Sequence, residues 1–196
     1  MLGLETRDEK CADRKECEID PVYDAFVNEL AERRDPKVIS NRSSSHALSI
    51  LRNVFKYAKS EVNIFTGELD PCVYNDKVLL EYAENFVGKG GKIKVILQNE
   101  IPQERMEAPQ DFYNFAVSKG EIKLADEKHP LKKIEKHFLV SDCMAYRLEL
   151  NIEERSAVCS FNDEHHASQL NDIFNAAWAS AAVKPIKNPS LAASPS

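Results

Sequence analysis

The strongest constraint on the fold is the alternation of strand and helix patterns in the first half of the chain. Residues 61–66 (EVNIFT) and 92–98 (KIKVILQ) predict two strands, and residues 121–124 predict a shorter third strand. Helical patterns precede, separate and follow the first two strands, at residues 44–59, 75–88 and 111–118. A strand–helix–strand order favours right-handed crossovers and parallel strands. The first half therefore predicts the parallel part of an α/β sheet.

The second half predicts a different connectivity. Three strand patterns, at residues 134–142, 145–150 and 156–161, follow one another closely. Such short spacing indicates hairpins, whose strands are antiparallel. A last helix is expected at residues 163–181. We therefore expect an α/β domain with three α/β/α layers, a mixed, mostly parallel central sheet and helices on both faces.

The ends of the chain differ in composition from this patterned part. Residues 1–20 are dominated by charged side chains and residues 184–196 by Pro, Ser and Ala, so both are predicted to be disordered tails. Residues 21–37 predict an N-terminal helix, which leaves residues 38–183 as the main domain. No apolar run approaches the ~20 residues that span a bilayer, and no secretory signal opens the sequence. These features predict a cytoplasmic protein without a membrane span.

Cysteine content and charge limit the cofactors and partners. The chain has five cysteines without a CxxC pair, which disfavours a disulfide framework and a structural zinc site. We therefore expect reduced thiols, no metal and no cofactor. The formal net charge of −6 disfavours non-specific coating of nucleic acid, which depends on neutralising phosphates. A local basic groove stays compatible with that charge, so a nucleic acid and a protein are both retained as candidate partners.

Two segments of the second half resemble motifs of a known family. Residues 135–142 (EKHFLVSD) are similar to the H-x-K-x-x-x-x-D motif of the phospholipase D superfamily, and residues 158–163 (VCSFND) look like its G-S-x-N turn. The order of elements from residue 44 onwards is also similar to the repeat unit of that superfamily. The resemblance implies a phospholipase D-like fold and a single half of a site that the family builds from two.

The first motif departs from the family pattern at its key positions. With Asp142 on the motif's aspartate, Glu135 stands where the family has its nucleophilic histidine and His137 where it has the lysine that neutralises phosphate. Cys159 replaces the first glycine of the turn. The resemblance therefore implies a degenerate domain that is catalytically inactive or impaired and acts as an interaction or nucleic-acid/phosphate-binding module.

The candidate site residues come from these segments and from the strand between them. The candidate catalytic residues are His137 and Glu135, which share one face of a strand. The candidate phosphate- or ligand-binding residues are Ser160, Asn162, Arg147 and Glu149. Each has a structural alternative: a neighbouring carboxylate could satisfy His137, Ser160 and Asn162 could cap the last helix, and Arg147 and Glu149 could be an exposed pair rather than a buried ion pair.

Two other functional hypotheses stay open. In the first, the chain is an atypical, metal-independent phosphodiesterase or nuclease that works as a homodimer, because a two-fold axis would bring two copies of His137 together. In the second, the chain is a structural or regulatory subunit whose resemblance is coincidental. Small members of the superfamily include nucleases, and divergent members occur in prokaryotic defence systems, which implies contact with nucleic acid by analogy alone.

Overall fold

The computed structural model describes residues 18–101, 111–126, 136–152, 154, 156–180 and 182–186. Its helices and strands follow one another in this order: α2 (Pro21–Arg33), β1 (Ile39–Asn41), α3 (Ser44–Tyr57), β2 (Glu61–Thr66), α4 (Pro71–Tyr74), α5 (Lys77–Gly88), β3 (Lys92–Leu97), α7 (Asp111–Lys119), β4 (Glu121–Ala125), β5 (Phe138–Ser141), β6 (Ala145–Asn151), β7 (Ser156–Ser160), α8 (Glu164–Trp178) and β8 (Val183–Pro185). Among the described helices, none has the length and apolar character needed to cross a membrane.

All eight strands join one mixed sheet in the order β1-β7-β6-β5-β2-β3-β4-β8. Strands β2, β3 and β4 are parallel to one another, as the alternating pattern of the first half predicts. Every other pair of neighbours is antiparallel. Parallel pairing is thus less extensive than a mostly parallel sheet implies, because the β5–β6–β7 hairpins and the short edge strands β1 and β8 add antiparallel pairs.

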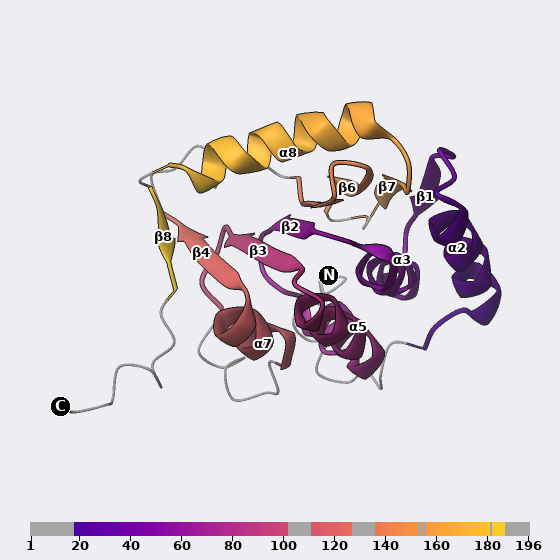
Figure 1. The fold of residues 1–196 in the computed structure, drawn as a ribbon, viewed down its shortest axis with the longest axis horizontal. Helices are drawn as coiled ribbons and strands as arrows, with labels where there is room; N and C mark the ends of the chain where they lie inside the picture. The colour runs from indigo at the N-terminus through magenta and orange to yellow at the C-terminus, as the bar shows by residue number, and fades with distance from the viewer. Residues whose placement is uncertain are drawn as a thin grey trace, which may run out of the picture.

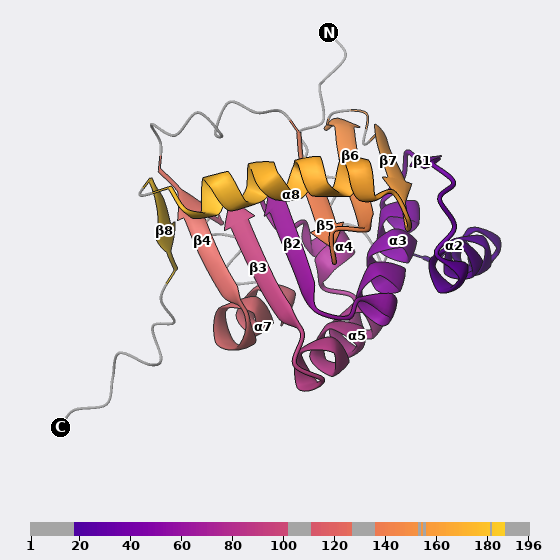
Figure 2. The same cartoon turned by 45° about the horizontal axis from the view of Figure 1, so that its top comes forward.

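Helices cover both faces of this sheet, which confirms the expected three-layer α/β/α architecture (Figure 1). Helix α8 lies across the strands on one face, as Figure 2 shows, and buries Phe174 and Ala177 against Phe65, Phe138 and Tyr146 of the sheet. Helices α3, α5 and α7 cover the other face and enclose the larger apolar cluster. The two faces are called below the α8 face and the α3 face.

The N-terminal helix is part of the same body. Asp20 caps α2 by accepting hydrogen bonds from the backbone N–H groups of Val22 and Tyr23, and Arg34, with φ 51°, ends the helix. Helix α2 packs on α3, while β1 pairs with β7 and extends the sheet by a strand that the sequence did not predict.

At the other end, β8 includes Lys184 and Pro185, so the sheet continues past the expected domain boundary at residue 183. Most of the two predicted tails, residues 1–17 and 187–196, lies outside the described residues.

A tight turn sets the register of β5 and β6. Asp142 and Cys143 both have φ 53°, and the N–H of Met144 donates to the carbonyl of Ser141 at 2.9 Å. Positive φ at both central residues is typical of a type I′ turn, which here lies within a three-residue connection between the paired residues Ser141 and Ala145. This turn places Leu139 opposite Arg147, and Tyr146 opposite Val140.

The aspartate of the motif-like segment fastens this hairpin to the start of β2. Its carboxylate accepts hydrogen bonds from the N–H groups of Lys59, Ser60 and Glu61 at 2.8, 2.8 and 3.0 Å, and from Ser60 Oγ at 2.7 Å. Burial alone would raise the pKa of Asp142, but the hydrogen bonds from Ser60 and from the backbone lower it below its usual value. Asp142 therefore stabilises the fold by holding the β5–β6 turn against the loop that precedes β2.

Candidate functional site

A polar cluster occupies the α3 face where the sheet turns from antiparallel to parallel strands. His137 immediately precedes β5, and its Nδ1 lies 2.9 Å from Glu149 Oε2 on β6. The backbone joins the same two residues, since the N–H of Glu149 donates to the carbonyl of His137 at 2.8 Å. Both side chains are mostly buried, with 17% and 12% of their surface exposed. His137 is thus paired with a neighbouring carboxylate, one of the two arrangements that the sequence allowed.

Arg147 contacts the second oxygen of the same carboxylate. Its Nη2 lies 3.6 Å from Glu149 Oε1, and 12% of each side chain is exposed, so the pair is a buried one. Burial alone would raise the pKa of Glu149, but the hydrogen bond from His137 and the charge of Arg147 lower it below its usual value. Glu149 is therefore ionised at neutral pH and holds an imidazole and a guanidinium on the same face.

The imidazole lies at the carboxyl ends of the parallel strands. A Cβ atom placed on Gly67, which follows β2, would come within 2.9 Å of His137 Nε2 and 3.6 Å of Asn99 Nδ2. Open α/β sheets bind ligands at the carboxyl ends of their strands. The cluster thus occupies the place where this class of fold presents its ligands, and Gly67 leaves the space that the imidazole fills.

Replacing Gly67 with alanine is expected to displace the imidazole of His137 and to lower the free energy of unfolding by about 1–2 kcal/mol. Urea denaturation measures the stability, and NMR of the His137 ring nitrogens reports loss of the contact with Glu149. Gly88→Ala is the control, because a Cβ on Gly88 meets nothing within 4 Å. Equal stability of the two variants would show that Gly67 does not limit the position of the imidazole.

Ser160 does not join this cluster. Ser160 lies opposite Tyr146, whose ring packs on the α8 face, whereas Arg147 lies opposite Cys159, which belongs to the α3 face. Cross-strand partners project to the same face of a sheet, so Ser160 points away from Arg147. The hydroxyl of Ser160 donates to the carbonyl of Pro36 at 3.3 Å. His137 and Ser160 therefore do not line one pocket, contrary to what the motif-like segments predict.

The structural alternative, in which Ser160 and Asn162 cap the last helix, is not observed either. Asp163 is the N-cap of α8, and its Oδ1 accepts from the N–H of His166 at 3.1 Å. The N–H of Asn162 points to Ser160 Oγ at 3.4 Å. Glu135, the other candidate catalytic residue, lies outside the described residues.

Cys159 lies beside the cluster as a protonated thiol. It is 1% exposed, and burial raises its pKa to about 12 even though the charge of Arg147 acts in the opposite direction. A nucleophilic cysteine requires a lowered pKa, because the thiolate is the reactive form. Cys159 therefore contributes packing beneath the polar groups. The described ranges contain no group of three or more His, Cys, Asp or Glu side chains placed to hold a metal ion.

Three residues near the cluster could not be predicted from the sequence. Tyr23 comes from α2, Asn41 from β1 and Tyr74 from α4, and none belongs to a motif. Burial raises the pKa of both phenols, and the charge of Arg147 partly offsets that effect at each. Both tyrosines thus lie within the electrostatic field of Arg147. Only the fold brings these separate elements together.

This combination of three parallel strands, an antiparallel β5–β6–β7 meander and a covering C-terminal helix is a phospholipase D-like α/β fold, and solved structures of that superfamily share it. Nuc from Salmonella typhimurium, a phospholipase D family member, has 11% identity and a TM-score of 0.52, over 78% of this chain and 97% of Nuc. NucT from Helicobacter pylori has 9% identity and a TM-score of 0.52, over 76% of this chain and all of NucT (100%). The archaeal chromatin protein TrmBL2, described with a novel mode of DNA binding, has 16% identity and a TM-score of 0.59.

The match to TrmBL2 covers 91% of this chain and 60% of TrmBL2, so the chain spans little more than half of that protein. The chain belongs to the DUF7931 family, a domain of unknown function whose sequence profile matches residues 43–186. A comparison with curated protein sequences gave no significant match. At these identities the solved structures establish the fold, and the chemistry of this site rests on its own residues.

Proposed function

We propose that this protein is a degenerate phospholipase D-like domain, catalytically inactive or strongly impaired, that acts as a binding module for a phosphate-bearing or nucleic-acid partner. The observation that carries this proposal is the separation of His137 from Ser160, which project to opposite faces of the sheet. Phosphoryl transfer requires the attacking group and the groups that stabilise phosphate to converge on one reacting atom. Residues on opposite faces of a sheet do not converge in that way.

The chemistry of the remaining cluster agrees with binding rather than turnover. Arg147 and His137 both contact Glu149, so a carboxylate lies beside the imidazole that would have to attack a phosphodiester. Cys159 is held as a neutral thiol. A buried ionic cluster of this kind is costly for a fold to keep, and such clusters often serve specificity. We therefore infer a recognition role for the cluster.

The class of partner is supported by the relatives. TrmBL2 is described as a DNA-binding chromatin protein, and Nuc and NucT share the same fold. The net charge of −6 favours contact through one local site over a broad electrostatic surface. Binding to a nucleic acid should accordingly depend only weakly on salt.

A metal-free phosphodiesterase assay tests the proposal. Wild-type protein is expected to turn over neither bis(p-nitrophenyl) phosphate nor single-stranded DNA or RNA above the rate of His137→Ala. His166→Ala is a matched control, because His166 is an exposed histidine on α8 that pairs with Asp163. Turnover that survives in His166→Ala and disappears in His137→Ala would contradict the inactive state.

One observation favours the alternative of a homodimeric phosphodiesterase. Glu149 holds Nδ1 of His137, which leaves Nε2 as the ring nitrogen available for attack or proton transfer. The same chain would then need a second copy of His137 across a two-fold axis. Positive turnover in the assay above, together with a dimeric mass by light scattering, would establish this alternative.

A further inference from the structure

The guanidinium of Arg147 is buried with far fewer partners than it has donors. Its side chain is 12% exposed, and its closest carboxylate oxygen in the described part of the chain is 3.6 Å away. Its Nε is buried without a hydrogen-bond partner among the described residues. A guanidinium carries five N–H donors, and burying a charged donor without an acceptor destabilises a fold. The arrangement is therefore incomplete as it stands.

A second incomplete group lies in the neighbouring cross-strand row. Asn41, the last residue of β1, is 2% exposed, and neither its side-chain oxygen nor its nitrogen has a partner in the described ranges. Asn41 lies opposite Ala157 on β7, and Ala157 lies opposite Glu149 on β6. Because cross-strand partners share a face, the amide of Asn41 and the carboxylate of Glu149 flank the small methyl group of Ala157.

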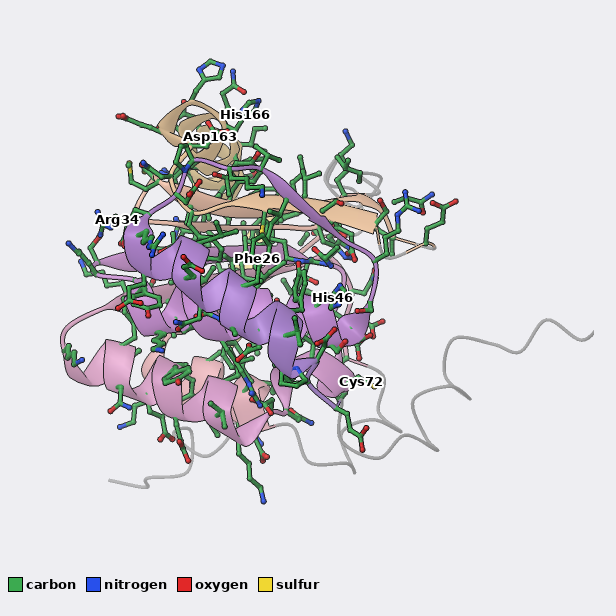
Figure 3. All side chains as sticks on the ribbon, turned by 90° about the vertical axis from the view of Figure 1, so that its right-hand side faces the viewer. Phe26, Arg34, His46, Cys72, Asp163 and His166 are labelled. Atoms are coloured by element: carbon green, nitrogen blue, oxygen red, sulfur yellow. The ribbon has the colours of Figure 1, made fainter. Side chains whose placement is uncertain are left out.

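The third incomplete group reaches the cluster from the helical layer. The hydroxyl of Tyr23 is buried, again without a partner within the described residues. Its ring stacks on His46 in the first turn of α3, with ring centres 3.7 Å apart. Figure 3 looks onto α2 and shows His46 near one end of that helix, with Arg34 at the other. Tyr23 also packs against the apolar cluster of the α3 face, which contains Cys159, the residue opposite Arg147.

Each of these three groups can donate hydrogen bonds. Arg147 only donates, and Asn41 and Tyr23 each offer a further N–H or O–H donor. Glu149 makes its short hydrogen bond with His137 at 2.9 Å, which leaves the guanidinium available to a further acceptor. Helix α3 begins at Ser44, three residues after Asn41, and a helix N-terminus adds positive potential. A small anion with several oxygen atoms would accept hydrogen bonds from this set of donors.

We propose that Arg147, Asn41 and Tyr23 form a binding site for a small oxyanion group, a carboxylate or a phosphate, enclosed between the α3 face of the sheet and the first turns of α2 and α3. This inference rests on the proposed binding function and names the class of ligand. The site is distinct from Ser160, which projects to the α8 face. Two of its three groups also come from residues upstream of the part that the family profile matches, residues 43–186.

Thermal unfolding of the full chain in sodium phosphate, sodium acetate or sodium chloride of equal ionic strength tests the site. Phosphate or acetate is expected to raise the midpoint beyond the chloride value, and the more effective anion assigns the source of the oxyanion. Isothermal titration then gives the affinity. Arg147→Gln is expected to weaken it at least about tenfold, as loss of a charged hydrogen bond does. Arg33→Gln is the matched control, since Arg33 is an exposed arginine that pairs with Glu29.

Tyr23→Phe keeps the test decisive if Arg147→Gln does not fold. It keeps the ring that stacks on His46 and removes only the unpartnered hydroxyl, so the ligand-free midpoint should stay the same or rise. Its anion affinity should nevertheless fall about threefold or more. Equal responses to all three salts in the wild type, or equal affinities in wild type and Tyr23→Phe, would overturn the site. Phosphodiesterase turnover would overturn the proposed function alone, so the two failures are distinguishable.

Discussion

Replacing Asp142 with alanine is expected to lower the free energy of unfolding by about 3 kcal/mol, one of the two largest losses that the structure predicts. The substitution removes a carboxylate that accepts from the backbone of Lys59, Ser60 and Glu61 and from the hydroxyl of Ser60. It also places alanine at φ 53°, a conformation that aspartate tolerates better. Urea denaturation monitored by circular dichroism measures the loss.

The dependence of this loss on pH identifies its cause. Because the pKa of Asp142 is lowered in the folded state, its contribution is present above the unfolded pKa of about 3.9 and disappears as pH falls towards the folded value. The difference between wild type and Asp142→Ala should therefore be constant near neutral pH and shrink below about pH 4. Asp172→Ala, which removes an exposed carboxylate of α8, should change the stability little at any pH. A loss that did not shrink in acid would assign the effect to backbone strain alone.

Glu149→Gln is the second substitution with a large expected effect, a loss of about 3 kcal/mol in the free energy of unfolding. The change keeps the size of the side chain but leaves Arg147 buried without its carboxylate and weakens the hydrogen bond to His137. The pKa of Glu149 is lowered, so this contribution is also present above the unfolded pKa of about 4.3 and lost as pH falls below it. Chemical denaturation at neutral pH and near pH 3.5 measures both values.

An exposed pair provides the comparison for Glu149. Glu29 contacts Arg33 at 2.8 Å on the surface of α2, and Glu29→Gln should cost less than about 0.5 kcal/mol. Adding Arg147→Met to Glu149→Gln should restore part of the stability, because the remaining unpaired charge is then removed. Equal costs for the two glutamates would mean that the cluster is solvated rather than buried.

The sequence predicted the elements that have a clear period. Strands β2 and β3 are short segments rich in Val and Ile, and α3, α5 and α8 have apolar faces, so their existence and type followed from pattern. The short elements did not: β1 and β8 have three residues each and α4 has four, too few to show a period. Their places depend on contacts with β7, β4 and α3, which are properties of the folded chain.

The sequence predicted the site only in part, because it does not show which residues of neighbouring strands lie opposite one another. Alternation showed that Arg147 and Glu149 share a face, and the structure makes them a buried pair. The contact between His137 and Glu149 depends on which residues form the β5–β6 turn, and the Asp142-Cys143 pair lacks the glycine that usually marks a type I′ turn. The different position of Ser160 also depends on register, because a shift of one residue along a strand moves a side chain to the other face.

The edge strand β1 has a consequence for where this structural unit begins. The family profile starts at residue 43, two positions after β1 ends. A polypeptide trimmed to that boundary would leave β7 with its hydrogen-bonding groups unpaired along one side. An open strand of this kind is a template on which sheets from separate molecules join. The folded unit accordingly extends upstream of the segment that the profile matches and includes α2 and β1.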